Sequence, residues 1–311
     1  MVQTGPLSLA VPCFAKINWL LKIEGRRPDG YHQITTIFQT IDLADRIRFT
    51  VTEDASIQLQ VAGREVSPGP DNLLYRAVSS VKQKAGVGLG LRILLEKRIP
   101  VGGGLGGGSS NAAVGLLAAN HLWNVQLSES ELANLGSALG ADVPFFLCGG
   151  TALGIGRGDE IRPLPDMAET PTLVLVYPGF PVPTSSAYQA RDWGEYRGEA
   201  VLTTLEADNK IQRFRQAMAK GDLSWLENDF EEVLFELYPA LAQVARLLRE
   251  AGCEPVRVSG SGSCVFGVAD PGRAAKIAQD VSLQAAGEVF LCRSLRSQEY
   301  RNSFASAGLE L

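Results

Sequence analysis

Pro100-Val-Gly-Gly-Gly-Leu-Gly-Gly-Gly-Ser-Ser110 is the stretch from which the rest of this 311-residue sequence can be interpreted. Glycine fills six of the seven positions from 102 to 108, although each glycine costs conformational entropy on folding. Backbone N–H groups without neighbouring Cβ atoms can surround an oxyanion, and a helix that begins near Ser109 adds free N–H groups and a partial positive charge. The stretch therefore predicts a phosphate-binding loop rather than a linker, which would be richer in serine.

The whole stretch is expected to contact the phosphates of ATP, and the hydroxyls of its two serines can also join a magnesium shell. The predicted ATP-binding residues of the stretch are Pro100, Val101, Gly102, Gly103, Gly104, Leu105, Gly106, Gly107, Gly108, Ser109 and Ser110.

Two other kinds of glycine-rich loop are alternatives to this interpretation. The Walker pattern is absent, because no lysine follows the glycines. The dinucleotide pattern G-x-G-x-x-G fits Gly102, Gly104 and Gly107, but such a match is nearly automatic in so glycine-dense a run. Its usual setting, a first βαβ unit with an acidic residue ending the next strand, is missing. A nicotinamide-dependent oxidoreductase therefore stays a minor alternative.

The residues around the loop read as alternating strands and helices. Strands are expected at 14–23, 35–43, 45–52 and 56–61, where β-branched and apolar residues lie between turn signals. Asp71 is expected to cap a helix at 72–84, and a strand at 89–97 leads into the loop. A helix at 109–124 follows, then a capping box formed by Ser128 and Glu131, then a strand at 151–155.

Pro163, Pro165 and Pro171 suggest a boundary between an ATP-binding domain at 1–165 and a second domain at 166–311. The second domain is expected to contain strands at 172–177, 256–258, 264–268 and 288–292, with helices at 209–219, 223–235, 240–251 and 272–279. Because strands and helices mix without a regular βαβ alternation, the predicted class is α+β.

Three further segments carry polar groups. Lys16 and Asn18, in Phe14-Ala-Lys-Ile-Asn18, alternate with apolar neighbours and so point to the same face of a strand. Asp142, in Gly140-Ala-Asp-Val-Pro-Phe145, would be desolvated unless paired. Ser259-Gly-Ser-Gly-Ser263 follows a strand and is as readily a plain turn as a binding loop. Taken singly, the first two also have ordinary readings, a solvated strand face and a helix cap.

The composition argues against several classes of protein, among them nucleic-acid-binding, disulfide-rich and membrane-spanning proteins. The net charge of −5 offers no basic excess for a nucleic-acid partner. Five widely spaced cysteines without a CxxC pair suggest neither disulfides nor a zinc site, and no metal-ligand cluster is expected. No secretory signal or membrane-spanning run is apparent, so no membrane partner and a cytoplasmic location are expected.

The segments together resemble the GHMP kinases. The resemblance rests on Ala15-Lys-Ile-Asn18, on the loop at 100–110 and on the late loop at 259–263, in that order. Arg27-Pro-Asp-Gly-Tyr-His32, Ala119-Asn-His-Leu-Trp123 and Gly140-Ala-Asp-Val-Pro-Phe145 further resemble members that act on a cytidyl polyol, 4-diphosphocytidyl-2-C-methyl-D-erythritol. The likeness runs from about residue 13 to residue 291, and the joint occurrence of the motifs is far more specific than any one of them.

The resemblance implies a fold with an N-terminal domain like the second domain of ribosomal protein S5 and a ferredoxin-like C-terminal domain. It places the active site in the cleft, with Asp142 as the catalytic acid and Lys16 as its partner. It also implies contacts to the substrate or to ATP: Tyr31, His32 and Tyr188 at the cytosine, Asn18 and Thr184 at the diphosphate or polyol, and Asn72 and Lys97 near the ATP.

The implied reaction is ATP- and Mg²⁺-dependent phosphorylation of the substrate's 2-hydroxyl in the non-mevalonate route to isoprenoids, by a monomer or weak homodimer. Phe14 and Trp19 depart from the family pattern, in which proline and leucine are usual, without removing a chemical group. Another GHMP kinase, of the homoserine or mevalonate type, stays the main alternative. An inert binding protein of this fold would be expected to lose Lys16 or Asp142.

Overall fold

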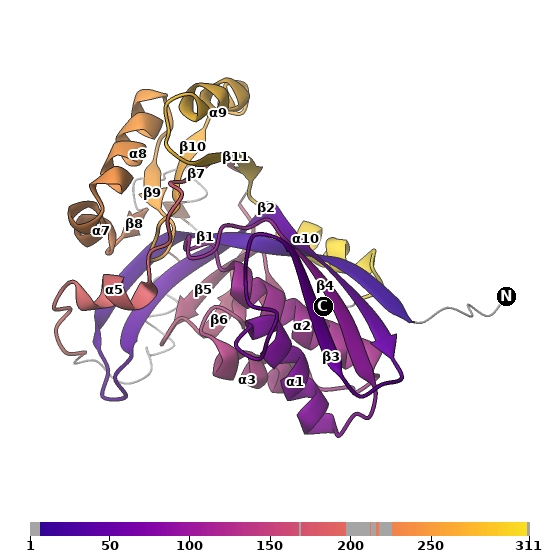
Figure 1. Ribbon diagram of the computed structural model, residues 1–311. Coiled ribbons are helices and arrows are strands. Elements are labelled where there is room, and N and C mark those ends of the chain that lie inside the picture. The colour runs from indigo at the N-terminus through magenta and orange to yellow at the C-terminus, as the bar shows by residue number, and fades with distance from the viewer. Residues whose placement is uncertain (1–6, 168, 197–211, 213–215, 218–225, 310–311) are drawn as a thin grey trace.

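The computed structural model describes residues 7–167, 169–196, 212, 216–217 and 226–309, and its strands form two sheets (Figure 1). The strands of the first sheet are Ser8–Arg26 (β1), His32–Thr52 (β2), Ile57–Gly63 (β3), Gly90–Lys97 (β4), Thr151–Ile155 (β5), Glu160–Pro163 (β6) and Glu227–Asn228 (β8). The strands of the second sheet are Thr172–Tyr177 (β7), Val256–Val258 (β9), Val265–Ala269 (β10) and Glu288–Arg293 (β11).

The first sheet is built around the long antiparallel pair of β1 and β2. Its strand order is β3-β4-β2-β1-β8, with β5 added to β2 and β6 added to β5. Leu91, Ile93 and Leu95 alternate along β4 and are buried, because a strand presents every second side chain to one face. They share one apolar core with the helices on that face: α1 (Leu73–Ala85), α2 (Gly107–Leu122) and α3 (Glu129–Leu139).

The second sheet is antiparallel throughout, in the order β11-β7-β10-β9. Helices α8 (Pro239–Glu250) and α9 (Ala274–Ser282) pack on it (Figure 1). In α8 the buried residues Leu241, Val244, Ala245 and Leu248 recur at helical spacing and join the core of this sheet. None of the described helices has the length and the apolar character needed to cross a membrane.

Two segments from the second half of the chain pack on the first sheet. Strand β8 pairs in parallel with β1. Helix α10 (Ser297–Ala305) buries Tyr300 and Phe304 completely, and both rings belong to the core of the first sheet. The Tyr300 hydroxyl donates a hydrogen bond to the Phe146 carbonyl at 2.6 Å. The predicted boundary near residue 165 stays a prediction.

Most of the expected elements are confirmed, and so is the α+β class. The strands at 151–155, 172–177 and 256–258 have the expected bounds, and the strand before the glycine-rich loop begins one residue later, at Gly90. The capping box of Ser128 and Glu131 is formed, with the Glu131 amide donating to Ser128 Oγ at 3.3 Å.

Three expectations are wrong in detail. Asn72, not Asp71, caps α1, because Asn72 Oδ1 accepts the Leu74 amide at 2.9 Å. The strands expected at 35–43 and 45–52 form one strand, β2. The helix expected at 223–235 begins only at Glu231, since residues 227–228 form β8; it is α7 (Glu231–Leu237). The helix expected at 209–219 lies mostly outside the described residues.

Candidate active site

A cavity of about 1340 Å³ brings the predicted site residues together. The segments that carry Lys16, the glycine-rich loop and the aromatic residues lie far apart in the sequence, but all of them line this cavity. Among the predicted site residues, only Ser110 does not line it. The volume exceeds that of an ordinary single-ligand pocket, which is roughly 300–1,000 Å³. It is therefore large enough for a nucleotide and a second substrate together.

The glycine-rich loop alternates in backbone conformation. Gly102, Gly104 and Gly106 have φ values of 68°, 74° and 66°, while the intervening residues do not have positive φ. Such alternation turns successive N–H groups towards one concave side and makes an anion-binding site. At Gly104 a Cβ would also lie 2.0 Å from the Ser259 carbonyl oxygen, so no other residue fits there.

The loop carbonyls bond to the surrounding protein. Four successive carbonyls accept hydrogen bonds: Gly102 from the Val182 amide at 3.1 Å, Gly103 from the Cys264 amide at 3.0 Å, Gly104 from Ser259 Oγ at 3.0 Å and Leu105 from the Lys16 amide at 3.0 Å. These bonds fix the loop to β1 and to the loop at 259–263. The fold itself therefore holds the loop in place.

The amides of the loop differ from its carbonyls. Among the described residues, no acceptor is found for the N–H groups of residues 101–109, which include the first turn of α2. Helix α2 begins without a side-chain cap, since its N-cap residue is Gly106. A row of free amides at a helix N-terminus favours phosphate groups.

Ser110 lies one turn into α2 and is fully buried. Its hydroxyl oxygen has no hydrogen-bond partner among the described residues. A buried hydroxyl without a partner is costly unless a ligand or an ion supplies one.

Lys16 and Asp142 form the charged pair of the cavity. Lys16 Nζ lies 3.4 Å from Asp142 Oδ2, and the Lys16 side chain is 4% exposed while that of Asp142 is 32% exposed. Lys16 Nζ also donates to Asn18 Oδ1 at 2.7 Å, and Asn18 Nδ2 donates to Thr36 Oγ1 at 2.7 Å. The expected common face of Lys16 and Asn18 is confirmed, and this chain of bonds fixes the ammonium beside the carboxylate.

Aromatic side chains form the end of the cavity near the turn between β1 and β2. The His32 ring stacks on Tyr188, with centroids 4.4 Å apart, and Phe230 packs edge-on against Tyr188 at 4.9 Å. Tyr31 is 56% exposed, and the guanidinium carbon of Arg157 lies 4.9 Å from its ring centroid. A planar, exposed ring with a cation beside it is suited to stacking on a base.

Burial shifts the titration of two of these groups. Burial, and then the charge of Arg26, lower the pKa of His32, so the neutral imidazole is favoured near pH 7. Burial, and then the charge of Asp142, raise the pKa of Tyr188, so its hydroxyl stays protonated. The pair therefore offers neutral donors and acceptors and no charge.

Asn72 and Lys97 line the cavity, but other residues of the protein already engage their side chains. Asn72 Nδ2 donates to the Ser67 carbonyl at 2.6 Å, in addition to its cap of α1. Lys97 Nζ forms a buried ion pair with Asp45 and donates to Asn111 Oδ1 at 3.3 Å. Their direct contacts to a nucleotide stay predictions.

The structural role of Asp45 was not predicted from the sequence. Asp45 is fully buried and accepts hydrogen bonds from the Arg98 amide at 2.7 Å and the Ile99 amide at 2.8 Å, just before the glycine-rich loop. The sequence offers little signal for it, because Asp45 is one of two acids in the stretch 41–51, with Asp42, and two arginines follow it there. Arg157 was also missed, because it lies in a short turn between β5 and β6 that shows no periodicity.

The sequence matches two family models, GHMP kinases N terminal domain at residues 72–150 and GHMP kinases C terminal at residues 202–286. A 4-diphosphocytidyl-2-C-methyl-D-erythritol kinase of Moorella thermoacetica is 42% identical over 86% of this chain and 92% of its own length. One of Solibacter usitatus is 45% identical, over 82% of this chain and 79% of its own.

Solved structures give the same picture. A 4-(cytidine 5'-diphospho)-2C-methyl-D-erythritol kinase has a TM-score of 0.73 and 37% identity, and the match covers 92% of this chain and 99% of that one. Homoserine kinase of Cytophaga hutchinsonii has a TM-score of 0.69 at 18% identity, over 96% of this chain and 98% of its own, which shows a shared fold alone. Neither the homoserine or mevalonate type nor an oxidoreductase is favoured. The chain belongs to the GHMP kinase family and, within it, to the 4-diphosphocytidyl-2-C-methyl-D-erythritol kinases.

Proposed function

We propose that this protein transfers the γ-phosphoryl group of ATP to the 2-hydroxyl of 4-diphosphocytidyl-2-C-methyl-D-erythritol, in non-mevalonate isoprenoid precursor synthesis. The observation that carries the assignment of residues is the row of free amides at 101–109 beside the Lys16–Asp142 pair. Phosphoryl transfer asks a protein mainly for positioning and for charge stabilisation. The row of amides and the Lys16–Asp142 pair support both requirements.

Asp142 is the proposed general base. Its carboxylate takes the proton of the 2-hydroxyl as the oxygen forms its bond to the γ-phosphorus and the bond to the leaving ADP breaks. Lys16, whose Nζ lies 3.4 Å from Asp142 Oδ2, stabilises the negative charge that develops on the attacking oxygen. Because Asn18 also binds the ammonium, Lys16 keeps its position while the charge moves.

The free amides at 101–109 are proposed to bind the triphosphate of ATP, assisted by the N-terminus of α2. A preorganised row of donors stabilises charge without reorganising during the reaction. The many bonds to the loop carbonyls supply that preorganisation.

Mg²⁺ fits this site mainly through the nucleotide. Among the described residues, no group of three or more His, Cys, Asp or Glu could hold a metal ion. The hydroxyl of Ser109, which lines the cavity, is a hard oxygen ligand of the kind that Mg²⁺ accepts, with phosphate oxygens and water completing the shell. Mg²⁺ bound there would neutralise phosphate charge.

The aromatic end of the cavity is proposed to bind the cytosine. Tyr31 would stack on the base, while His32 and Tyr188 would contact its polar edge or opposite face. Asn18 and Thr184 would contact the diphosphate or the polyol, because both line the same cavity.

A coupled assay of ADP release tests the function directly. We expect turnover with ATP and the cytidyl polyol, and a new phosphomonoester signal in the ³¹P NMR spectrum of the product. Mevalonate and homoserine are the matched alternative acceptors, and turnover with them should be negligible. Equal or faster turnover with either of them, or none with the cytidyl polyol, contradicts the proposal.

A further inference from the structure

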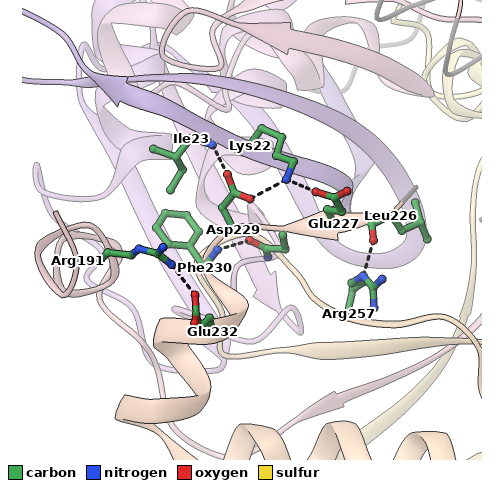
Figure 2. A network of polar contacts seen from close by, with 10 residues as sticks. Lys22, Ile23, Arg191, Leu226, Glu227, Asp229, Phe230, Glu232 and Arg257 are labelled. Atoms are coloured by element: carbon green, nitrogen blue, oxygen red, sulfur yellow. Dashed lines mark hydrogen bonds and ion pairs between the residues drawn. The ribbon is translucent and has the colours of Figure 1, made fainter. Parts of the chain in front are cut away.

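Residues 227–231, which we call the buckle, join strand β1 to the loop at 259–263. On the β1 side, the Asp229 amide donates to the Leu21 carbonyl at 3.0 Å, and Asp229 Oδ2 accepts the Ile23 amide at 2.8 Å. Lys22 forms ion pairs with both Glu227 and Asp229, the second at 3.0 Å (Figure 2). The buckle is thereby fixed to the strand that carries Lys16.

Asn228 and Glu231 fix the other side of the buckle. Asn228 is 7% exposed, and its Nδ2 donates to the carbonyls of Val258 and Gly260, both at 2.8 Å. Its Oδ1 accepts the Phe230 amide at 3.0 Å, so both the amide group and the carbonyl group of the side chain are engaged. Glu231 Oε1 accepts the Val258 amide at 2.8 Å. Asn228 therefore sets where Gly260 lies.

Gly260 and Ser261 line the cavity next to Lys16. A Cβ on Gly260 would lie 3.2 Å from Lys16 Nζ and 3.3 Å from Asn18 Oδ1. The hydroxyls of Ser261 and Thr184 are 2.9 Å apart. The loop thus brings backbone and hydroxyl donors to an ammonium group.

The amides of Gly260 and Ser261 have no acceptor among the described residues, although both residues are buried. Buried donors without an acceptor are costly unless a ligand provides the oxygen. Two adjacent amides, two hydroxyls and an ammonium are the donors that bind a phosphate or diphosphate. The glycine-rich loop at 101–109 has its own free amides, so this is a second anion-binding position in the same cavity.

We propose that Gly260, Ser261 and Thr184 bind the diphosphate of the acceptor and that Asn228 is the positioning residue for this cradle. The proposal rests on the proposed function, because that function supplies an acceptor with a diphosphate. Lys16 contacts both anion-binding positions: its amide bonds to the Leu105 carbonyl at 3.0 Å, and its ammonium lies beside Gly260. The buckle thereby couples acceptor binding to the strand of the catalytic lysine.

The test measures the affinities for cytidine 5'-diphosphate and for cytidine, with a non-hydrolysable ATP analogue saturating the nucleotide position. We expect the wild-type protein to prefer the diphosphate by about tenfold or more. Asn228→Asp keeps the shape but sets a carboxylate against two carbonyls, so we expect it to lose most of this preference. Its affinity for cytidine and its KM for ATP should stay within about threefold, because the base and ATP are bound elsewhere.

Two further variants keep the result interpretable. Asn302→Asp makes the same change on the exposed face of α10 and should leave the preference unchanged. Thr184→Val removes a hydroxyl at an exposed position that tolerates the change, so it remains informative if Asn228→Asp does not fold; we expect a loss of about threefold or more in the preference.

A wild-type protein without preference for the diphosphate, or folded Asn228→Asp and Thr184→Val proteins that keep the preference, overturns the proposal. Displacement of the ATP analogue by cytidine 5'-diphosphate, without binding beside it, also overturns it. If the preference behaves as expected but the cytidyl polyol is not phosphorylated, the cradle stands and the proposed function fails.

Discussion

Asp142 and Lys16 lie 3.4 Å apart, so a change in one alters the charge around the other. We expect Asp142→Asn to lower kcat by roughly 10²- to 10⁴-fold with little change in the KM for ATP, because an amide cannot accept the hydroxyl proton. Steady-state kinetics with both substrates measure this. Asp270→Asn, in the exposed turn between β10 and α9, is the control. A kcat within a few-fold of wild type removes Asp142 from the role of base.

The protonation of His32 makes the stability of the protein depend on pH. Burial and Arg26 lower the pKa of His32 in the folded protein below the ordinary 6.5, so the unfolded chain binds a proton that the folded chain does not. The stability that His32 contributes is therefore complete above pH 6.5 and is lost as the pH falls from 6.5 through the folded pKa.

Denaturant unfolding at about pH 7.5 and about pH 5.5 measures this loss. We expect the wild-type protein to lose more free energy of unfolding on acidification than His32→Gln does. His121→Gln, at the exposed end of α2, should behave as the wild type. An equal loss in wild type and His32→Gln contradicts the prediction.

At the scale of elements, the glycine-rich loop contains glycines that no other residue can replace and glycines that alanine can replace without a clash. Gly104→Ala should destabilise the fold, because φ is +74° and the new Cβ would lie 2.0 Å from a carbonyl oxygen. Gly108 is exposed in the first turn of α2, and a Cβ there meets only Leu73 Cδ1 at 3.5 Å. Gly108→Ala should therefore leave the free energy of unfolding unchanged or raise it by about 0.5–1 kcal/mol, since alanine is the better helix former.

Thermal and denaturant unfolding of the two variants tests this comparison. Equal destabilisation by both substitutions contradicts it. The KM for ATP of Gly108→Ala is a separate readout, because the new methyl group lies in the cavity where the phosphates are proposed to bind.

The elements and residues that have a signal within a short stretch of sequence could be predicted from the sequence. The strand before the loop, the capping box and α8 each have their own periodicity or cap, and the charged pair and the glycines lie in short motifs. Strand β8 is too short for any pattern, and α10 buries only Tyr300 and Phe304 of a largely polar segment. The roles of Asp45 and Asn228 could not be predicted, because their hydrogen-bond partners lie far away in the sequence.

At the scale of the whole molecule, α10 completes a core that the first half of the chain begins. Tyr300 packs on Gly149, where a Cβ would lie 2.2 Å from the ring, and the ring lies 5.7 Å from that of Phe14. We expect Tyr300→Ala to lower the free energy of unfolding by about 3–5 kcal/mol, as for other buried aromatics. Tyr300→Phe keeps the ring and should cost about 1–3 kcal/mol, since the Phe146 carbonyl loses its donor.

Denaturant unfolding of both variants at one pH provides the measurement. A cost for Tyr300→Ala no greater than that for Tyr300→Phe would show that the ring adds little to the core. Leu291→Ala is a suitable control, because that side chain is 50% exposed.

The packing of α10 also means that the core of the first sheet can be completed only late in synthesis of the chain. Ribosomes release a chain from its N-terminus onwards, so β1 to β6 emerge long before Tyr300 and Phe304 exist. Until then the apolar surface around Phe14 and Gly149 stays open to water. A nascent chain arrested after residue 165 should accordingly be sensitive to protease or held by a chaperone, and the part of the chain that carries the glycine-rich loop should acquire its final rigidity only when translation has passed residue 305.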